Sequence, residues 1–240
     1  MKKIQSAVRR ALTDFSMIND GDVIAVGVSG GKDSLVLLAA LAAMRRYLPQ
    51  KFELKALMLN MGFDGWDSSE IARFCDLTDV PFYTKDTEIA KVIFDIRKES
   101  NPCSLCAKMR RGALNEFAVG MGCNKVALGH HFDDVIETFF LSLLYEARLS
   151  CFDAVCYLDR VNVTVIRPLI YVKEHEIKSY VKRTNLPVMF NPCPADGYTK
   201  REDMKQMLAE FERGNRDAKE RIFRAVKEGL LMKGKTGTDA

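Results

Sequence analysis

The sequence has 240 residues, of which 48% are hydrophobic and 28% charged, and a formal net charge of +4. This composition is typical of a globular chain with a sizeable core, and the mild basic excess permits nucleic-acid binding without requiring it. No apolar run approaches the roughly 20 residues of a membrane span, and the first residues lack the apolar block of a signal peptide, so we expect a cytoplasmic protein with no membrane partner.

The first part of the chain alternates apolar strands with helices. Residues 1–18 have the spacing of a basic amphipathic helix, and "DVIAVGVS" is apolar throughout, which predicts a buried strand. A helix follows to about Tyr47. Further strands are expected at 52–61, 80–87 and 125–131, and further helices at 70–77, 88–96, 108–122 and 133–147. This alternation predicts an α/β fold with a doubly wound parallel sheet.

The pattern changes after Arg148. We expect one more strand at 161–170, a helix at 173–184, a short extended piece at 186–190, and two charged helices at 200–213 and 215–233. The predicted organisation is an N-terminal basic helix (1–20), a main domain (21–190), a helical C-terminal extension (191–233) and a tail (234–240).

The hexapeptide "SGGKDS" stands between the first strand and its helix. Ligands of α/β sheets bind at the carboxyl ends of the strands. Two adjacent glycines let backbone N–H groups approach a ligand, while the helix start and Lys32 add positive charge. The predicted phosphate site comprises Ser29, Gly30, Gly31, Lys32, Asp33 and Ser34. The alternative is a tight strand-to-helix turn with solvated polar residues.

A polar cluster, "GHHFDD", follows the strand at 125–131. Its side chains are His130, His131, Asp133 and Asp134, and they are expected at the same edge of the sheet as the glycine turn. A catalytic or metal-binding role for at least one aspartate is one interpretation. The other is that an aspartate caps the following helix, and the two are compatible.

Seven cysteines in a chain without an export signal argue against a disulfide framework. Cys103 and Cys106 have C-x₂-C spacing directly before a helix, and Cys193 lies far along the chain. Two thiolates at this spacing can hold one metal centre, although half a zinc site, a redox pair or chance would give the same spacing. The remaining four are expected to be packing residues: Cys75, Cys123, Cys151 and Cys156.

"SGGKDS" resembles the signature of the PP-loop ATP pyrophosphatases. The ordered set "SGGKDS", "CSLCAKMRRG", "GHHFDD", "VIRPL" and a late cysteine, over about residues 20–195, resembles the tRNA 2-thiocytidine synthetases. This resemblance implies that the turn binds the pyrophosphate of ATP. Adenine would lie near Leu59, at the end of the second strand, and Gly129 would let the backbone pass close to the nucleotide. It also implies Mg²⁺, for which Asp33, Asp133 and Asp134 are candidate ligands.

The same resemblance implies a [4Fe–4S] cluster on Cys103, Cys106 and Cys193, whose open iron can carry hydrosulfide. The family usually has a second C-x₂-C late in the chain, whereas here Cys193 is followed by "PAD". We expect three thiolates to suffice. The implied catalytic residues are Lys32, Asp33, Arg110 and Asp134.

The implied reaction is adenylation of C2–O of a cytidine in tRNA and replacement of the oxygen by sulfur, with AMP and pyrophosphate released. The sulfur donor would be a cysteine desulfurase or free sulfide, and a homodimer is expected. Two alternatives stay open. One is a lysidine-synthetase-type or amidotransferase-type ligase, which uses an amine and needs no clustered cysteines. The other is a non-catalytic nucleotide or iron–sulfur sensor.

A tRNA substrate requires phosphate contacts and base stacking. The dense basic stretches are Lys2, Lys3, Arg9 and Arg10; Lys178, Lys182 and Arg183; and Lys200, Arg201 and Lys205. Arg110 and Arg111 are further candidates for phosphate or tRNA contacts. The candidate stacking residues are Phe63, Trp66 and Tyr198. Any of these charges can instead belong to a solvated helix face.

Overall fold

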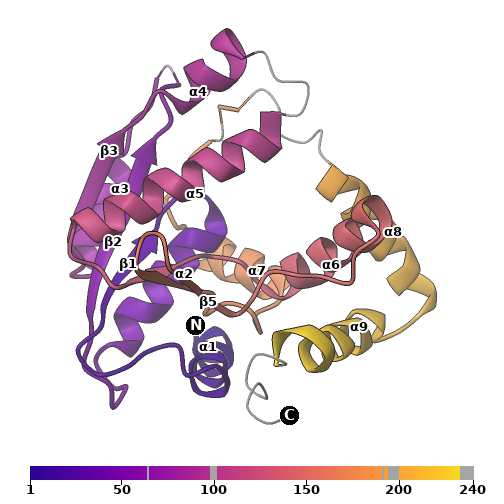
Figure 1. Ribbon diagram of the computed structural model, residues 1–240. Coiled ribbons are helices and arrows are strands. Elements are labelled where there is room, and N and C mark those ends of the chain that lie inside the picture. Colours follow the sequence, from indigo (N-terminus) through magenta and orange to yellow (C-terminus); the bar gives the residue numbers. More distant parts are fainter. Residues whose placement is uncertain (64, 98–101, 191, 194–199, 233–240) are drawn as a thin grey trace.

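The computed structural model describes the chain except residues 64, 98–101, 191, 194–199 and 233–240. Within the described residues, a six-stranded sheet has the order β3-β2-β1-β4-β6-β5 (Figure 1). The strands are β1 (Val23–Gly27), β2 (Glu53–Asn60), β3 (Phe82–Asp86), β4 (Lys125–Ala127), β5 (Val155–Leu158) and β6 (Val163–Ile166). The pairs from β3 to β6 are parallel, and β5 runs antiparallel to β6 at the edge.

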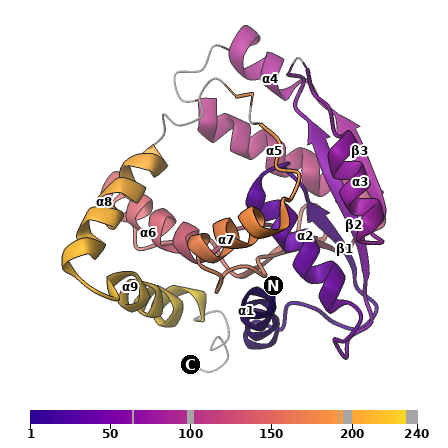
Figure 2. The ribbon, with the colours of Figure 1, turned by 180° about the vertical axis from the view of Figure 1, so that it is seen from behind.

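Helices cover both faces of the sheet. They are α1 (Lys2–Asp14), α2 (Lys32–Met44), α3 (Ser69–Leu77), α4 (Ile89–Lys91), α5 (Pro102–Gly120), α6 (Phe132–Glu146), α7 (Glu174–Thr184), α8 (Lys200–Gly214) and α9 (Ala218–Val226), with π-helical turns η1 (Val92–Ile96) and η2 (Lys227–Leu231). Helix α5 lies across one face, and α2 and α3 lie across the other (Figures 1 and 2).

Alternate side chains of β1 divide between two apolar cores. Ile24 and Val26 face the larger core, which α2 shares, whereas Ala25 faces a smaller core that α5 completes. Every second residue of a strand points to the same face, so a strand buried on both sides is apolar throughout. This arrangement confirms the predicted doubly wound α/β sheet.

Helix α2 is anchored along most of its length. The side chains from Leu35 to Leu38 are fully buried, because the helix is apolar all round and is enclosed by protein. Its first residue, Lys32, therefore has a fixed place at the carboxyl end of β1, directly after the glycine turn.

Two elements differ from the sequence prediction. Helix α5 begins at Pro102 rather than at residue 108, because proline is well suited to the first helical position, and Cys103 and Cys106 therefore lie inside the helix. Strand β5 was not predicted. It is four residues long and pairs with β6 as a hairpin, in which Leu158 lies opposite Val163.

The C-terminal helices pack onto the sheet domain. The ring of Phe223 in α9 stacks on Phe132 of α6 at 4.4 Å and meets Tyr171 edge-on at 5.9 Å. These contacts are buried and join the larger core. The boundary expected near residue 190 stays a prediction. Of the helices in the described ranges, each is too short or too polar to cross a membrane.

Candidate active site

The hydroxyl groups of Ser29 and Ser34 stabilise the glycine turn. The Ser34 hydroxyl donates to the carbonyl of Gly31 at 2.9 Å, and it lies 3.3 Å from the hydroxyl of Ser29. Gly30 has φ +79°, a conformation that favours glycine, and Gly31 is the N-cap of α2. The turn therefore has a defined shape at the positive end of a helix, where anions bind.

Two neighbouring segments press against this turn. The N–H of Met189 donates to the carbonyl of Gly30 at 3.0 Å, and a Cβ on Gly30 would lie 2.8 Å from the Met189 sulfur. A Cβ on Gly129 would lie 3.1 Å from backbone atoms of Asp33 and Ser34. Gly129 thus lets the β4–α6 loop pack against the start of α2. Its predicted closeness to a nucleotide stays a prediction.

Lys32 is held between two carboxylates. Its Nζ lies 3.0 Å from Oδ2 of Asp33 and 3.3 Å from Oε1 of Glu174. Burial alone would lower the pKa of Lys32, but the charges of Asp33 and Glu174 outweigh burial and raise it. A fully charged ammonium group therefore stands at the glycine turn.

Glu174 was not singled out in the sequence, although it is the first residue of α7. Its Oε1 also lies 3.1 Å from Nζ of Lys205, and its Oε2 lies 3.1 Å from Nζ of Lys178. Burial opposes ionisation of this carboxyl, but the hydrogen bonds from Lys178 and Lys205 and the charge of Lys32 lower its pKa to about 2. An acidic residue in the first turn of the helix after β6 is the signal that could have indicated it.

Asp33, His131 and Asp134 form a second polar group beside the turn. Asp134 accepts from the N–H of His131 at 2.8 Å, and the imidazole caps α6 in return. The helix-capping interpretation is therefore confirmed for Asp134. Nε2 of His131 lies 3.7 Å from Oδ1 of Asp33, which is beyond hydrogen-bonding distance. This Asp33 oxygen is buried and accepts no hydrogen bond from the residues that the structure describes.

Helices α8 and α9 place cations next to carboxylates in the first two turns of α6. Arg201 lies 2.8 Å from Oδ1 of Asp134 and 3.2 Å from Oε2 of Glu137. Asp133 pairs with Lys219 at 3.2 Å and accepts from the N–H of Glu174 at 2.8 Å. Asp133 thus connects α6, α7 and α9. Asp134 instead contacts His131, whose ring lies beside Asp33 of the turn.

Glu137 gives the protein a testable pH dependence. Burial and the charge of Asp134 raise its pKa from 4.5 to about 7, against the pull of Arg201. Between these pH values the folded state holds a proton that the unfolded state has released, so this residue's contribution to the free energy of unfolding falls as pH rises.

We therefore expect the free energy of unfolding of wild type, minus that of Glu137→Gln, to fall steadily from pH 4.5 to 7. Urea denaturation at several pH values in chelator-containing buffer measures it. A difference that stays constant over this range would contradict the assignment.

The three predicted thiol ligands approach one another from two distant segments. Burial raises the pKa of Cys106; Arg110 counteracts it by charge and a hydrogen bond, and nearby Cys193 and Cys103 raise it further. Cys103 is exposed, and Cys106 and Cys193 are half-buried. Cys106 and Arg110 are four residues apart on α5 and so share one face.

The donor set is suited to an iron–sulfur cluster, because thiolates are its usual ligands. Among the residues that the structure describes, no three His, Cys, Asp or Glu side chains are close enough to hold one metal ion. A cluster of four irons spreads its thiolates further apart than a single ion does. The chemistry of the three thiols is compatible with a cluster, which stays a prediction for this protein.

Arg167, from the "VIRPL" motif, directly follows β6. Its guanidinium covers the ring of Phe152 at 4.8 Å, and the same ring packs against His130. Burial lowers the pKa of Arg167. The charge of Cys156 opposes this change, and the charge of Arg111 adds to it. Burial, and then the charge of Arg167, lower the pKa of His130 to about 4, so its imidazole is neutral at pH 7.

Leu59 is half-buried near the end of β2, and its closeness to adenine stays a prediction. A groove lies close by, between the start of α3 and the segment that covers Gly30. It is lined by Asp67, Ser69, Glu70 and residues 185–189. Phe190, directly after this groove, is 89% exposed and precedes Cys193. An exposed aromatic face of this kind can stack on a base.

The predicted stacking residues are placed less favourably. Phe63 packs on Phe94 at 6.2 Å, and Trp66 packs against the larger core. Tyr198 lies outside the described residues. Among the other cysteines, Cys75 and Cys123 are buried, as the packing interpretation expects, whereas Cys151 and Cys156 are only half-buried.

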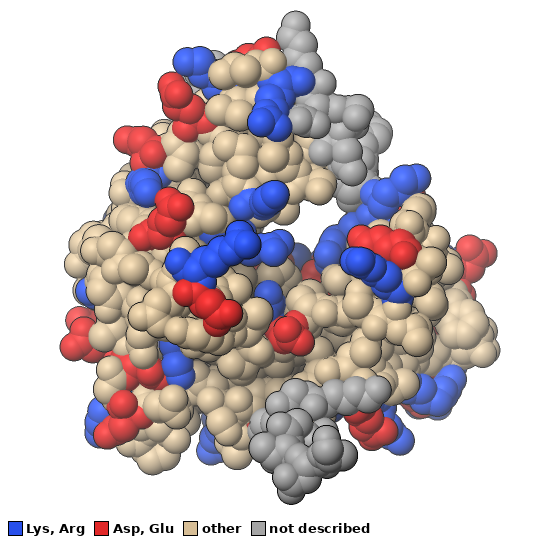
Figure 3. Space-filling model, viewed as in Figure 1, with Lys and Arg blue, Asp and Glu red and all other residues tan. Residues whose placement is uncertain are grey.

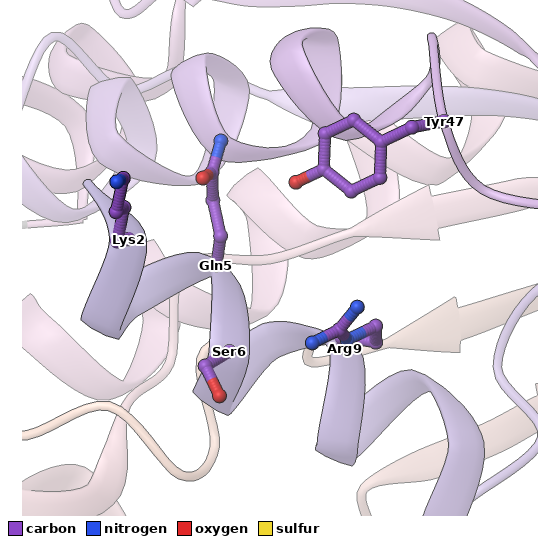
Figure 4. A pocket seen from close by; sticks show the side chains of 5 residues that line it. All are labelled: Lys2, Gln5, Ser6, Arg9 and Tyr47. Carbon is purple, nitrogen blue, oxygen red and sulfur yellow. The ribbon is translucent and has the colours of Figure 1, made fainter.

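Some residues of the basic stretches make contacts inside the protein. Arg201 and Lys205 pair with buried carboxylates, and Arg10 covers the ring of Tyr171 at 4.4 Å. Lys2 and Arg9 instead line a small pocket with Gln5, Ser6 and Tyr47, where α1 meets the segment after α2 (Figure 4). Charge patterns in a sequence do not reveal which cations face a carboxylate.

Comparisons with known proteins agree with this geometry. A family model described as the PP-loop domain matches residues 2–210. The tRNA-cytidine(32) 2-sulfurtransferase of Geobacter sulfurreducens is 40% identical over 228 residues, covering 94% of this chain and 89% of the relative. The enzyme of that name from Vibrio parahaemolyticus is 32% identical, covering 94% and 76%. The chain belongs to the tRNA-cytidine(32) 2-sulfurtransferase family.

Members of the tRNA-cytidine(32) 2-sulfurtransferase family are PP-loop transferases, so the resemblance seen in the sequence is confirmed. The U34-tRNA thiolase NcsA from Methanococcus maripaludis, solved with its [4Fe–4S] cluster, superposes with a TM-score of 0.79 at 24% identity, covering 95% of this chain and 78% of that chain. At this identity the likeness shows the fold alone, which is that of the PP-loop domain.

Proposed function

We propose that this protein is an ATP-dependent tRNA sulfurtransferase that converts a cytidine of tRNA to 2-thiocytidine. The observation that carries the proposal is the charged Lys32 at the glycine turn that begins α2, a site suited to the phosphates of ATP. The presence of Cys103, Cys106 and Cys193 in a chain with a PP loop favours sulfur transfer over an amine-using ligase. The names of its relatives favour position 32 as the target.

In the first step, the C2 oxygen of cytidine attacks the α phosphate of ATP, and the α–β anhydride bond breaks. Lys32 and the backbone N–H groups of the glycine turn bind the departing pyrophosphate, because both present positive charge to phosphate oxygens. The buried free oxygen of Asp33, with Asp134 close by, would hold Mg²⁺. That ion would supply charge neutralisation on the phosphates.

In the second step, sulfur forms a bond to C2 and the oxygen leaves with AMP. A cysteine desulfurase or free sulfide would supply the sulfur. Cys103, Cys106 and Cys193 would hold a [4Fe–4S] cluster, which when bound offers an iron without a protein ligand. Arg110 counteracts the unfavourable effect of burial on the Cys106 thiolate, which favours the ligating form.

The substrate RNA has a basic approach to these groups. The space-filling view is hollowed between α5 and α8, and lysine and arginine side chains gather on both sides of the opening (Figure 3). Helix α5 presents exposed Lys108, Arg110 and Arg111, and α8 begins with exposed Lys200. Phosphate contacts from such residues would position tRNA, and Phe190 would stack on a base.

A cytoplasmic location and a homodimer belong to the same proposal. Both rest on the resemblance to the family, and the described residues contain no membrane-spanning helix.

Nucleoside mass spectrometry tests the proposal. We expect tRNA from a strain lacking the gene to lack 2-thiocytidine and to regain it when the wild-type gene, but not Lys32→Ala, is restored. Purified enzyme with ATP, sulfide and tRNA should release AMP, pyrophosphate and 2-thiocytidine. An amine-modified cytidine would favour the ligase, and ATP binding without pyrophosphate release would favour a sensor.

A further inference from the structure

Two cations on one face of α8 reach into the nucleotide site. Arg201 and Lys205 are four residues apart, so their side chains emerge on the same side of the helix. Arg201 contacts a carboxylate at the start of α6, and Lys205 contacts one at the start of α7. Both carboxylates belong to helices that begin at the carboxyl edge of the sheet.

Each carboxylate leads on to the glycine turn. From Arg201, the contacts run through Asp134 and His131 towards Asp33, with separations of 2.8, 3.4 and 3.7 Å. From Lys205, they run through the single oxygen Oε1 of Glu174 to Lys32, at 3.1 and 3.3 Å. The two series end on adjacent residues at the start of α2, the residues expected to meet phosphate and Mg²⁺.

Helix α8 also stands next to the third thiol along the chain. It begins at Lys200, shortly after Cys193, and Cys193 lies close enough to Cys106 to influence its ionisation.

We propose that Arg201 and Lys205 are positioning residues that couple ATP binding at the glycine turn to the placement of α8. The inference rests on the proposed function, because it requires ATP at this turn. When Lys32 turns from Glu174 to the phosphates, Oε1 is left to Lys205 alone. The repulsion between the two ammonium groups that share this oxygen disappears, and α8 is held more firmly.

Amide hydrogen exchange tests the coupling without tRNA or sulfur. The full chain is purified anaerobically, and exchange in α8 is compared with and without α,β-methylene-ATP and Mg²⁺. In wild type we expect the analogue to slow exchange in α8 by about fivefold or more, the lower range of a typical coupling between sites. Lys205→Met should abolish this slowing, whereas Lys205→Arg should preserve it, because it keeps the charge.

Lys178→Met is the matched control. Lys178 contacts the same carboxylate, at 3.1 Å, but belongs to α7. This variant should keep the response of α8. If the loss of any cation from Glu174 were enough to abolish the response, Lys178→Met would lose it too. Exchange in α2 and thermal melting verify that each variant is folded.

The outcomes separate the two proposals. If the analogue binds wild type but exchange in α8 does not change, or if Lys205→Met responds as wild type does, the coupling is wrong and the proposed function stands. If the analogue fails to bind wild type, the proposed function is wrong and the coupling is wrong with it.

Discussion

The Lys32→Ala variant is expected to lose ATP cleavage. Lys32 is the charged side chain at the start of α2, and its Nζ is held 3.0 and 3.3 Å from carboxylates that phosphate would replace. Removing one preorganised group that stabilises developing charge typically lowers kcat by about 100-fold or more. We therefore expect release of AMP and pyrophosphate to fall at least to that extent, as measured with radiolabelled ATP and bulk tRNA.

This variant should fold normally. Without Lys32, Glu174 still has Lys178 and Lys205, and the Asp33 side chain is partly exposed to solvent. Lys91→Ala is the matched control, because Lys91 lies on α4 in an exposed pair with Glu88. AMP formation by Lys32→Ala at the wild-type rate would remove the glycine turn from catalysis.

The Cys193→Ala variant is expected to lose thiolation and the brown colour of anaerobically purified protein. A cluster held by three thiolates should not survive the loss of one, since the chain segment after Cys193 offers "PAD" in place of a second late cysteine. Iron and acid-labile sulfide should fall close to zero, and 2-thiocytidine should become undetectable. Binding of α,β-methylene-ATP should persist, because Cys193 lies outside the glycine turn.

Cys156→Ala is the control for this experiment. Cys156 is half-buried, as Cys193 is, but it lies on the edge strand β5. It should keep its iron and its colour. A colourless wild-type protein that contains zinc and still thiolates tRNA would show that the three cysteines hold a different metal.

Local patterns in the sequence were sufficient to predict the sheet and the glycine turn. The alternation of apolar strands and helices and the pair Gly30–Gly31 each have a physical cause within a few residues. Strand β5 was not predicted, because a run of four residues, none of them buried, is too short to give a periodic signal. The start of α5 escaped because the polar run before the cysteines suggested a loop, although Pro102 suits a helix start.

The charge network could not be predicted, because it joins segments far apart in the chain. Glu174 receives Lys32 from α2 and Lys205 from α8, and helix periodicity alone treats all three as solvated. Arg201 was assigned to RNA phosphates, yet it pairs with Asp134 and Glu137 inside the protein. The packing of α8 against α6 determines that Arg201 contacts these carboxylates.

The hydrogen bonds inside the glycine turn have a consequence for selectivity. The carbonyl oxygens of Gly30 and Gly31 already accept from the Met189 N–H and the Ser34 hydroxyl. At least one lone pair of each carbonyl is therefore already in use, while Asp33 keeps a buried oxygen without a donor among the described residues. We therefore expect phosphate to bind at the helix start of the turn and a divalent cation to bind Asp33 beside it.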